Sequence, residues 1–187
     1  MNKPLLLSLV LVALTGCDGL KFGAPSASDN DDPHFPRRNI SHIFKDDDLS
    51  HQVSRSIRKQ YASYANQVRV VVYQDDLLLL GQVPNSSVRK SIESMASRHA
   101  DHRHVINRIS VEPAPTSLVR TSDSWINTKI KAQLLSEQQI HGSQFKVVTE
   151  NGVVYLMGRV SPEEAALAKQ IAKQTTGVKK VVSIVDS

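Results

Sequence analysis

Three histidines, His99, His102 and His104, stand close together near the middle of the chain. In an extended segment, alternation would place the rings of His102 and His104 on one face, where both could ligate zinc. No carboxylate or cysteine is placed to complete a tetrahedron, and Arg98 and Arg103 would repel a cation. The pattern therefore favours a solvated, partly pH-sensitive loop, with metal binding as the open alternative.

A run of three carboxylates, Asp46–Asp48, is the second candidate site, because clustered oxygens can bind a divalent cation. A single run without a second group of oxygen ligands makes a poor cage. The apolar residues Leu49, Val53 and Ile57 follow it at helical spacing. The aspartates are therefore interpreted as acidic residues at the N-terminus of a helix.

Nothing else in the sequence is arranged for catalysis. It contains no nucleophile elbow, no glycine-rich phosphate loop, no convincing metal quartet and no carboxylate pair of predictable geometry. The formal net charge of +5 is mild, and no run of lysine or arginine is dense enough to indicate nucleic acid. We predict a protein that is not an enzyme, has no cofactor and does not bind nucleic acid.

Cys17 is the only cysteine, and the sequence before it is typical of a signal peptide. Lys3 precedes the apolar run Leu5–Leu14, which is too short for a permanent membrane span. The run ends in Leu14-Thr15-Gly16-Cys17, which resembles the bacterial lipobox. We predict a lipoprotein signal peptide at residues 1–16 and a lipid anchor on Cys17, at the periplasmic face of a membrane. The alternative is a secreted protein with an incidental cysteine.

The segment after the cysteine is predicted to be a lipidated flexible tether over residues 17–45. It is rich in Ser, Asp, Asn, Pro and Arg and has no hydrophobic periodicity. Its second residue, Asp18, resembles the residue of enteric lipoproteins that stay at the inner membrane. The sequence therefore leaves the inner and the outer membrane open.

The rest of the chain repeats one small module. The stretch Phe145–Val160 pairs two apolar runs across Asn151-Gly152, a dipeptide suited to a type I′ hairpin turn. The stretch Val68–Val83 repeats it 77 residues earlier without a gap, but with Gln74 and Asp75 at the turn, so this first hairpin is expected to be looser or strained. We predict modules at 46–112 and 122–187, joined by a linker at 113–121.

Each module is predicted to run helix, strand, strand, helix, strand. In the second module Ser122, Asp123 and Ser124 are the expected N-caps of a helix from Trp125 to about Ser136. The first module has a second helix over about Ser86–His99, and Ser161-Pro162-Glu163-Glu164 opens its counterpart as a capping box. The fold class is therefore α+β, with a small three-stranded mixed sheet packed by two helices in each module.

The helix that begins at Trp125 has an unusual outward side. At about 100° per residue, the side opposite the apolar stripe Ile126, Ile130 and Leu134 carries a tryptophan, a leucine and flanking lysines. These outward residues are Trp125, Thr128, Lys129, Lys131, Ala132 and Leu135. Such a side is suited to an apolar, anionic surface. The alternative is that Trp125 packs against the first module or its own hairpin.

Both repeats resemble the BON domain (bacterial OsmY and nodulation). The resemblance rests on the hairpin pattern of Asn151–Val160 and on the closing Gly177-Val178-Lys179-Lys180-Val181. A lipobox followed by two such repeats is similar to the dual-BON outer-membrane lipoproteins of Gram-negative bacteria, a family that includes division- and stress-associated lipid-binding lipoproteins. Two tandem BON domains are the fold that this resemblance implies.

The resemblance also implies a function. It predicts a periplasmic lipoprotein that supports outer-membrane integrity and binds anionic phospholipid through the first helix of its second BON domain. The implied positions are Trp125, Thr128, Lys131, Ala132 and Leu135. The alternative is a scaffold whose Trp125 side docks a protein partner of the envelope or of the division machinery.

Overall fold

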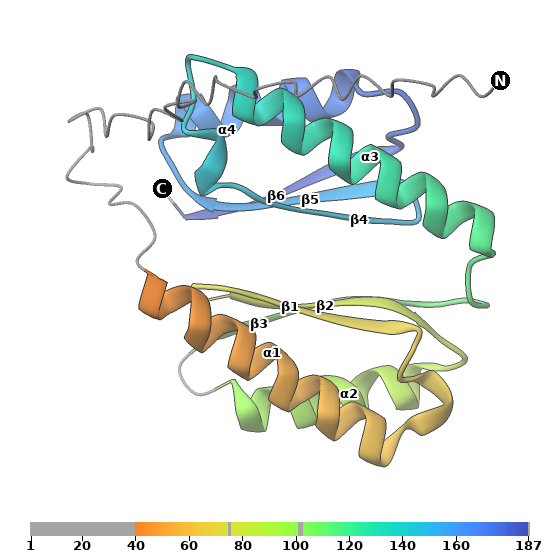
Figure 1. Cartoon of the computed structure of the whole chain (residues 1–187). Coiled ribbons are helices and arrows are strands. Elements are labelled where there is room, and N and C mark those ends of the chain that lie inside the picture. The colour runs from red at the N-terminus through yellow and green to blue at the C-terminus, as the bar shows by residue number, and fades with distance from the viewer. Residues whose placement is uncertain (1–39, 75, 101–102, 187) are drawn as a thin grey trace, which may run out of the picture. The chain divides into compact units, whose positions relative to one another are not determined.

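The structure is a computed structural model that describes residues 40–74, 76–100 and 103–186. The first module contains α1 (Ile40–Gln60), the short η1 (Ala62–Tyr64), β1 (Val68–Tyr73), β2 (Asp76–Val83), α2 (Ser86–His99) and β3 (His104–Val111) (Figure 1). The second contains α3 (Ser117–Ser136), the short η2 (Gly142–Gln144), β4 (Lys146–Glu150), β5 (Val153–Arg159), α4 (Pro162–Gln174) and β6 (Lys180–Asp186). The predicted α+β class and the element order are confirmed in both modules.

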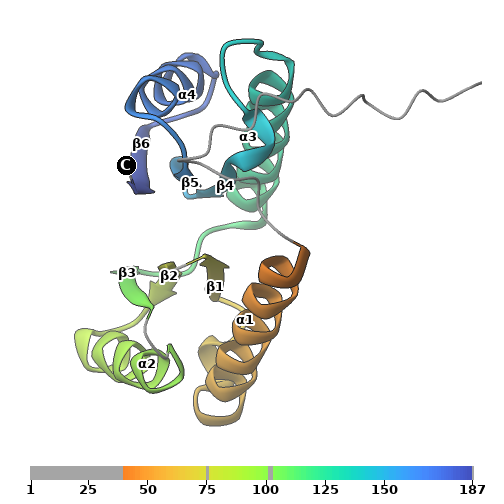
Figure 2. The same cartoon turned by 90° about the vertical axis from the view of Figure 1, so that its left-hand side faces the viewer.

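Each module has one three-stranded mixed sheet. In the first, β1 pairs antiparallel with β2 and β2 pairs parallel with β3; β4, β5 and β6 repeat this arrangement. The parallel connection needs a crossover, which α2 and α4 supply. Figure 2 shows both helices of each module on the same side of its sheet.

The helix-facing side of each sheet forms the core of its module. The predicted stripe of Leu49, Val53 and Ile57 is buried against β1, β2 and α2. Its counterpart in the second module is buried in the same way, with Ile126, Ile130 and Leu134 facing the sheet. The predicted helical spacing is therefore confirmed at the positions that build both cores.

The other sides of the two sheets share a third cluster. Along Leu77–Leu80, alternate side chains point to opposite faces, so Leu77 and Leu79 join the helices while Leu78 and Leu80 join this cluster. Met157 and Tyr155 of β5 pack into it from the second module. An uninterrupted apolar run is the expected sequence of a strand that is buried on both faces.

The first residues of the two hairpin turns have the same backbone φ although they are different residue types. Pairing continues to Tyr73↔Asp76 in the first module and to Glu150↔Val153 in the second, which leaves two turn residues in each. Gln74 has a φ of 51° and Asn151 a φ of 52°. The first hairpin is therefore not looser, although the positive φ is a less favourable conformation for glutamine than for asparagine.

A buried aspartate of the preceding helix holds each turn. Asp123 accepts hydrogen bonds from the backbone N–H groups of Asn151 and Gly152, at 2.7 and 2.8 Å. Asp46 lies 77 residues earlier and accepts from the N–H of Gln74 at 2.9 Å. Asp46 is only 1% exposed, and Arg103 donates to it at 3.2 Å. A carboxylate that accepts backbone N–H groups is a strong hydrogen-bond partner, so these contacts stabilise both turns.

These contacts correct two predictions about helix starts. The helix α1 begins at Ile40, not at Asp46–Asp48, and α3 begins at Ser117, not at Trp125. Thr116, rather than Ser122, Asp123 or Ser124, is the N-cap of α3. The predictions placed the aspartates at helix N-termini because acidic residues are favoured there. In each module, however, one aspartate lies inside the helix and its carboxylate caps the hairpin turn.

Candidate functional site

The predicted lipid-binding residues lie along the side of α3 that faces away from the sheet. Trp125 is 51% exposed and Leu135 is 66% exposed. Thr128, Lys131 and Ala132 between them are also exposed, and Lys129 is partly buried. Trp125 therefore does not pack into the core or beneath its own hairpin. We call these six residues the outer face of α3.

Lys129 and Trp125 form the most specific contact of this face. The Lys129 ammonium lies over the indole ring, 4.9 Å from its centroid. A cation over an aromatic face is attracted by the quadrupole of the ring. The contact holds a positive charge directly beside a large apolar ring, while Thr128 donates its hydroxyl to the carbonyl of Ser124 at 3.0 Å and so keeps its own polar group satisfied.

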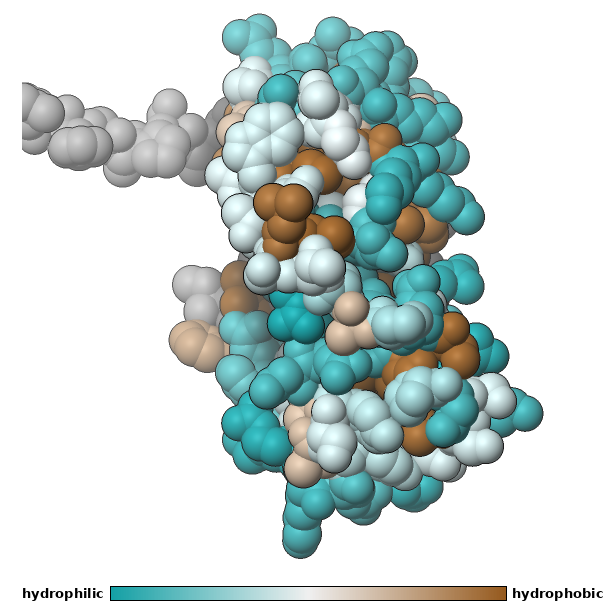
Figure 3. All heavy atoms as spheres, turned by 90° about the vertical axis from the view of Figure 1, so that its right-hand side faces the viewer, coloured by the Kyte–Doolittle hydropathy of each residue, from teal (hydrophilic) through white to brown (hydrophobic). Residues whose placement is uncertain are grey.

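One further residue of this face was missed by the sequence interpretation. Leu118 is 78% exposed and lies on α3 seven residues, or about two turns, before Trp125. It was missed because the helix was predicted to begin at Trp125. Its spacing from Trp125 and Ala132 was the signal available in the sequence. On the face of the molecule that Figure 3 shows, apolar residues emerge in patches among hydrophilic ones.

The positions of α1 that match the outer face of α3 are hydrophilic, although Phe44, one turn before Asp48 on the same side, is 70% exposed. The residues 77 positions before Trp125, Thr128, Lys129, Ala132 and Leu135 are Asp48, His51, Gln52, Arg55 and Arg58. All five are exposed, and Gln52 donates to Asp48 at 2.7 Å. The predicted difference between the two helices is therefore present in the folded chain at these five positions.

The histidines are held by different partners. His99, at the end of α2, is 3.1 Å from the Ser56 hydroxyl, and His104, at the start of β3, is 3.6 Å from the Asp76 carboxylate. His102 lies outside the described residues. Within the described part of the chain, no three His, Cys, Asp or Glu side chains are grouped closely enough to hold a metal ion.

The predicted anchor residue Cys17, its neighbour Asp18 and most of the predicted tether lie outside the described residues. No helix in the described ranges has the length and apolar character that crossing a membrane requires.

Comparison with known proteins gives consistent results for both modules. The family model of the BON domain matches residues 45–113 and 122–185. The chain is 30% identical over 187 residues to the outer membrane lipoprotein DolP of Haemophilus influenzae, covering 98% of this chain and 95% of that protein. It is also 34% identical over 119 residues to a 21 kDa hemolysin of Actinobacillus pleuropneumoniae, covering 64% of this chain and 61% of the hemolysin.

Proposed function

This chain belongs to the BON-domain family, and we propose that it is a lipid-anchored envelope protein of the outer membrane whose second BON domain binds anionic phospholipid through the outer face of α3. Binding would hold the domain against the membrane surface and so support envelope integrity. One relative is named an outer membrane lipoprotein and another a hemolysin, which supports a role at membranes.

The contact between Trp125 and Lys129 is the observation that carries this proposal. A half-exposed indole with an ammonium group 4.9 Å from its ring centroid offers an apolar surface and a positive charge at the same point. This combination matches the boundary of a bilayer, where acyl chains lie directly beneath phosphate groups.

The flanking residues extend the match along the helix. Leu118 and Leu135 lie beyond the two ends of the central residues and are more exposed than Trp125. Lys131 adds a second positive charge to that of Lys129, and its side chain is exposed. A basic residue near an anionic membrane surface contributes about 1 kcal/mol, and this contribution falls as salt is added.

Vesicle binding of the whole chain carrying Cys17→Ser tests the proposal, because this change removes only the predicted acylation site. Trp125 is the only tryptophan, so its emission reports on the proposed site directly. Anionic vesicles should shift the emission to the blue, and added salt should weaken the shift. Zwitterionic vesicles should produce a much smaller shift.

Two matched variants distinguish the contribution of the outer face of α3 to vesicle binding from the effect of net charge. Leu135→Glu keeps the Trp125 reporter, and we expect it to weaken binding to anionic vesicles by at least about tenfold, because it removes apolar area and adds a repelled charge. His51→Glu makes the same kind of charge change on the matching side of α1 and should leave binding nearly unchanged. Equal binding by both variants would contradict the proposal. Capture of an envelope protein through Trp125 in the absence of anionic lipid would favour the scaffold alternative.

A further inference from the structure

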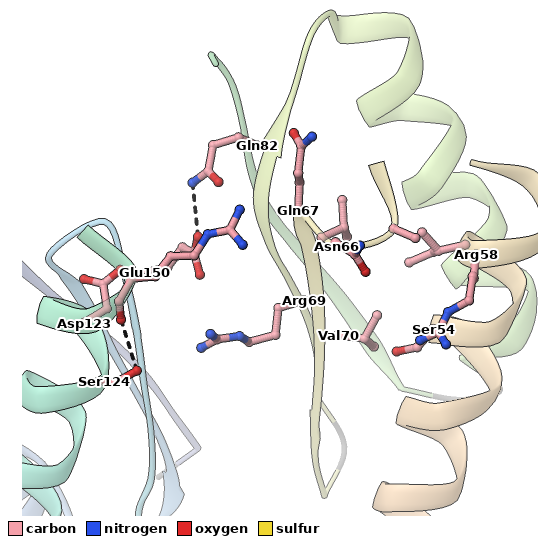
Figure 4. A pocket seen from close by; sticks show the side chains of 14 residues that line it. Ser54, Arg58, Asn66, Gln67, Arg69, Val70, Gln82, Asp123, Ser124 and Glu150 are labelled. Carbon is pink, nitrogen blue, oxygen red and sulfur yellow. Dashed lines mark hydrogen bonds between the residues drawn. The ribbon is translucent and has the colours of Figure 1, made fainter. Parts of the chain in front are cut away.

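A second candidate binding site lies apart from the outer face of α3. It is a cavity of about 320 Å³ lined by residues of both BON domains. Its charged lining consists of three arginines, Arg58, Arg69 and Arg120, and two carboxylates, Asp123 and Glu150. Figure 4 shows Arg69 extending from its strand toward Glu150 and Asp123. None of these positions belongs to the proposed membrane-binding face.

The arginines leave most of their donors available. Arg69 donates one N–H to the carbonyl of Thr149 at 3.4 Å, and a guanidinium has five such donors. Within the described residues, neither Arg69 nor Arg120 forms an ion pair with a carboxylate. Two guanidinium groups that face one polar cavity are well suited to bind a phosphate group.

The arginines need an anionic acceptor, whereas the Gln82 side chain needs a hydrogen-bond donor. Its side chain is buried, with 2% of the residue exposed, and its amide nitrogen donates to Glu150 at 3.1 Å. Because a carboxylate only accepts, this bond fixes the amide orientation and directs the Gln82 oxygen elsewhere. That oxygen is buried and has no hydrogen-bond partner among the described residues. A buried acceptor of this kind requires a donor, and an adjacent carboxylate favours a positively charged one.

We propose that this cavity binds a small zwitterion that carries a phosphate group and a primary ammonium group, of which phosphoethanolamine is the simplest representative. The phosphate lies between Arg69 and Arg120, and the ammonium donates to the Gln82 oxygen and to Glu150. Three arginines against two carboxylates give the lining a net charge of +1. A phosphate monoester with one ammonium group has a complementary charge of about −1 near neutral pH.

The test titrates the whole chain carrying Cys17→Ser with free phosphoethanolamine and follows the backbone amide signals by NMR. We expect saturable shifts at Arg69, Gln82 and Arg120. Phosphocholine has the same charges but no N–H donor, so it should bind at least about tenfold more weakly. Equal affinity for the two ligands would overturn the role assigned to the Gln82 oxygen.

Substitutions in the cavity test which residues bind the phosphate group and which bind the ammonium group of the ligand. Arg69→Gln and Arg120→Gln should each weaken binding about tenfold, because each removes a charge-assisted contact to phosphate. Arg98→Gln, on α2 and outside the cavity lining, is the matched control and should have no effect. Glu150→Gln should weaken the binding of phosphoethanolamine but not the binding of methyl phosphate. Unchanged binding in both cavity arginine variants would overturn the proposal.

Vesicles distinguish the source of the ligand. Shifts with the free compound indicate a soluble ligand, whereas shifts at the same amides only with vesicles that display phosphoethanolamine headgroups indicate a lipid. No shift at these amides with either would overturn the site. The Trp125→Glu variant should titrate with free phosphoethanolamine like the parent chain, so failure of the proposed membrane function would leave this result unchanged.

Discussion

The helices α1 and α3 have matched apolar residues on their inner sides and different residues at the corresponding outer positions. Their inward positions carry matched apolar residues and a buried aspartate that holds the hairpin turn. Outward, α3 presents Trp125 and Leu135 where α1 presents Asp48 and Arg58. Because folding depends on the inner side only, the outer sides were free to differ. The outer side is therefore where a function specific to one domain should be sought.

The difference also shows why exposure matters more than composition. The outer face of α3 contains only a few apolar residues, but they lie in one line and remain exposed. Many more apolar residues lie in the strands, where the helices and the opposing sheet cover them. An exposed line of large apolar residues on a single helix is the unusual feature and so the more informative one.

The largest expected effect concerns the feature that the two helices share. Asp123→Ala leaves the partly buried N–H of Asn151 and the buried N–H of Gly152 without their acceptor, so we expect the free energy of unfolding to fall by about 3 kcal/mol. Asp46→Ala should cause a loss of similar size, because Gln74 and Arg103 lose their partner. Urea unfolding followed by circular dichroism measures both. If only one of the two substitutions lowers the free energy of unfolding, the two aspartates are not equivalent.

A smaller effect is expected from transferring the outer face. Asp48→Trp with Arg58→Leu places apolar residues on α1 where α3 has Trp125 and Leu135. In a Trp125→Glu background, this pair should raise binding to anionic vesicles on the order of tenfold, because it restores apolar area at an exposed helix side. Vesicle co-sedimentation measures the change. Ser97→Trp, at an exposed position on α2, is the control; an equal gain there would mean that any exposed tryptophan suffices.

The smallest effect concerns the capping box at the start of α4, which α2 lacks because its N-cap Asn85 is followed three residues later by Val88. Burial alone raises the pKa of Glu164, but hydrogen bonds from the backbone and ring of His141 and from the Ser161 N–H outweigh it and leave the pKa below its usual value of 4.5. The lowered pKa means that the charged form stabilises the folded state. This stabilisation is complete above about pH 4.5 and is lost as pH falls through the folded-state pKa.

Glu164→Gln tests this dependence. At neutral pH the variant should be less stable by about 1 kcal/mol, a typical value for a helix cap. Below about pH 4.5 the difference should shrink, because the parent chain then loses the same interaction. Urea unfolding between about pH 6 and pH 3 measures it. Counted from the N-cap, the same position of α2 is Val88, whose N–H donates to the Asn85 side chain at 2.9 Å, so Val88→Ala should show no such pH dependence.

The elements and the outer face of α3 were predicted from the sequence because they depend on local patterns. Helical spacing identified Ile126, Ile130 and Leu134 as buried, and the angle between neighbouring residues then placed Trp125 outside. The capping box at Ser161 and Glu164 was likewise predicted from residue type and spacing, and both of its hydrogen bonds are present. In both cases the residues that form the pattern lie within a few positions of one another in the sequence.

The features that were missed depend on partners far along the chain. Asp123 resembled an N-cap, yet its partners Asn151 and Gly152 lie about thirty residues later, and no local pattern indicates that pairing. The same holds for the start of α3, since acidic and hydroxyl residues suggested a later N-cap and so hid Leu118. Gln82 gives no sign in the sequence that its side chain is buried beside Glu150.

The sequence by itself determined the repeated αββαβ modules and the uneven character of their first helices, because hydrophobic period and turn residues act over short distances. Only the tertiary structure decided which buried aspartate holds which turn, and that Leu78 and Leu80 pack toward the opposite sheet. It also decided that Gln82 and three arginines line one cavity. These outcomes depend on contacts between segments that the chain brings together only when it folds.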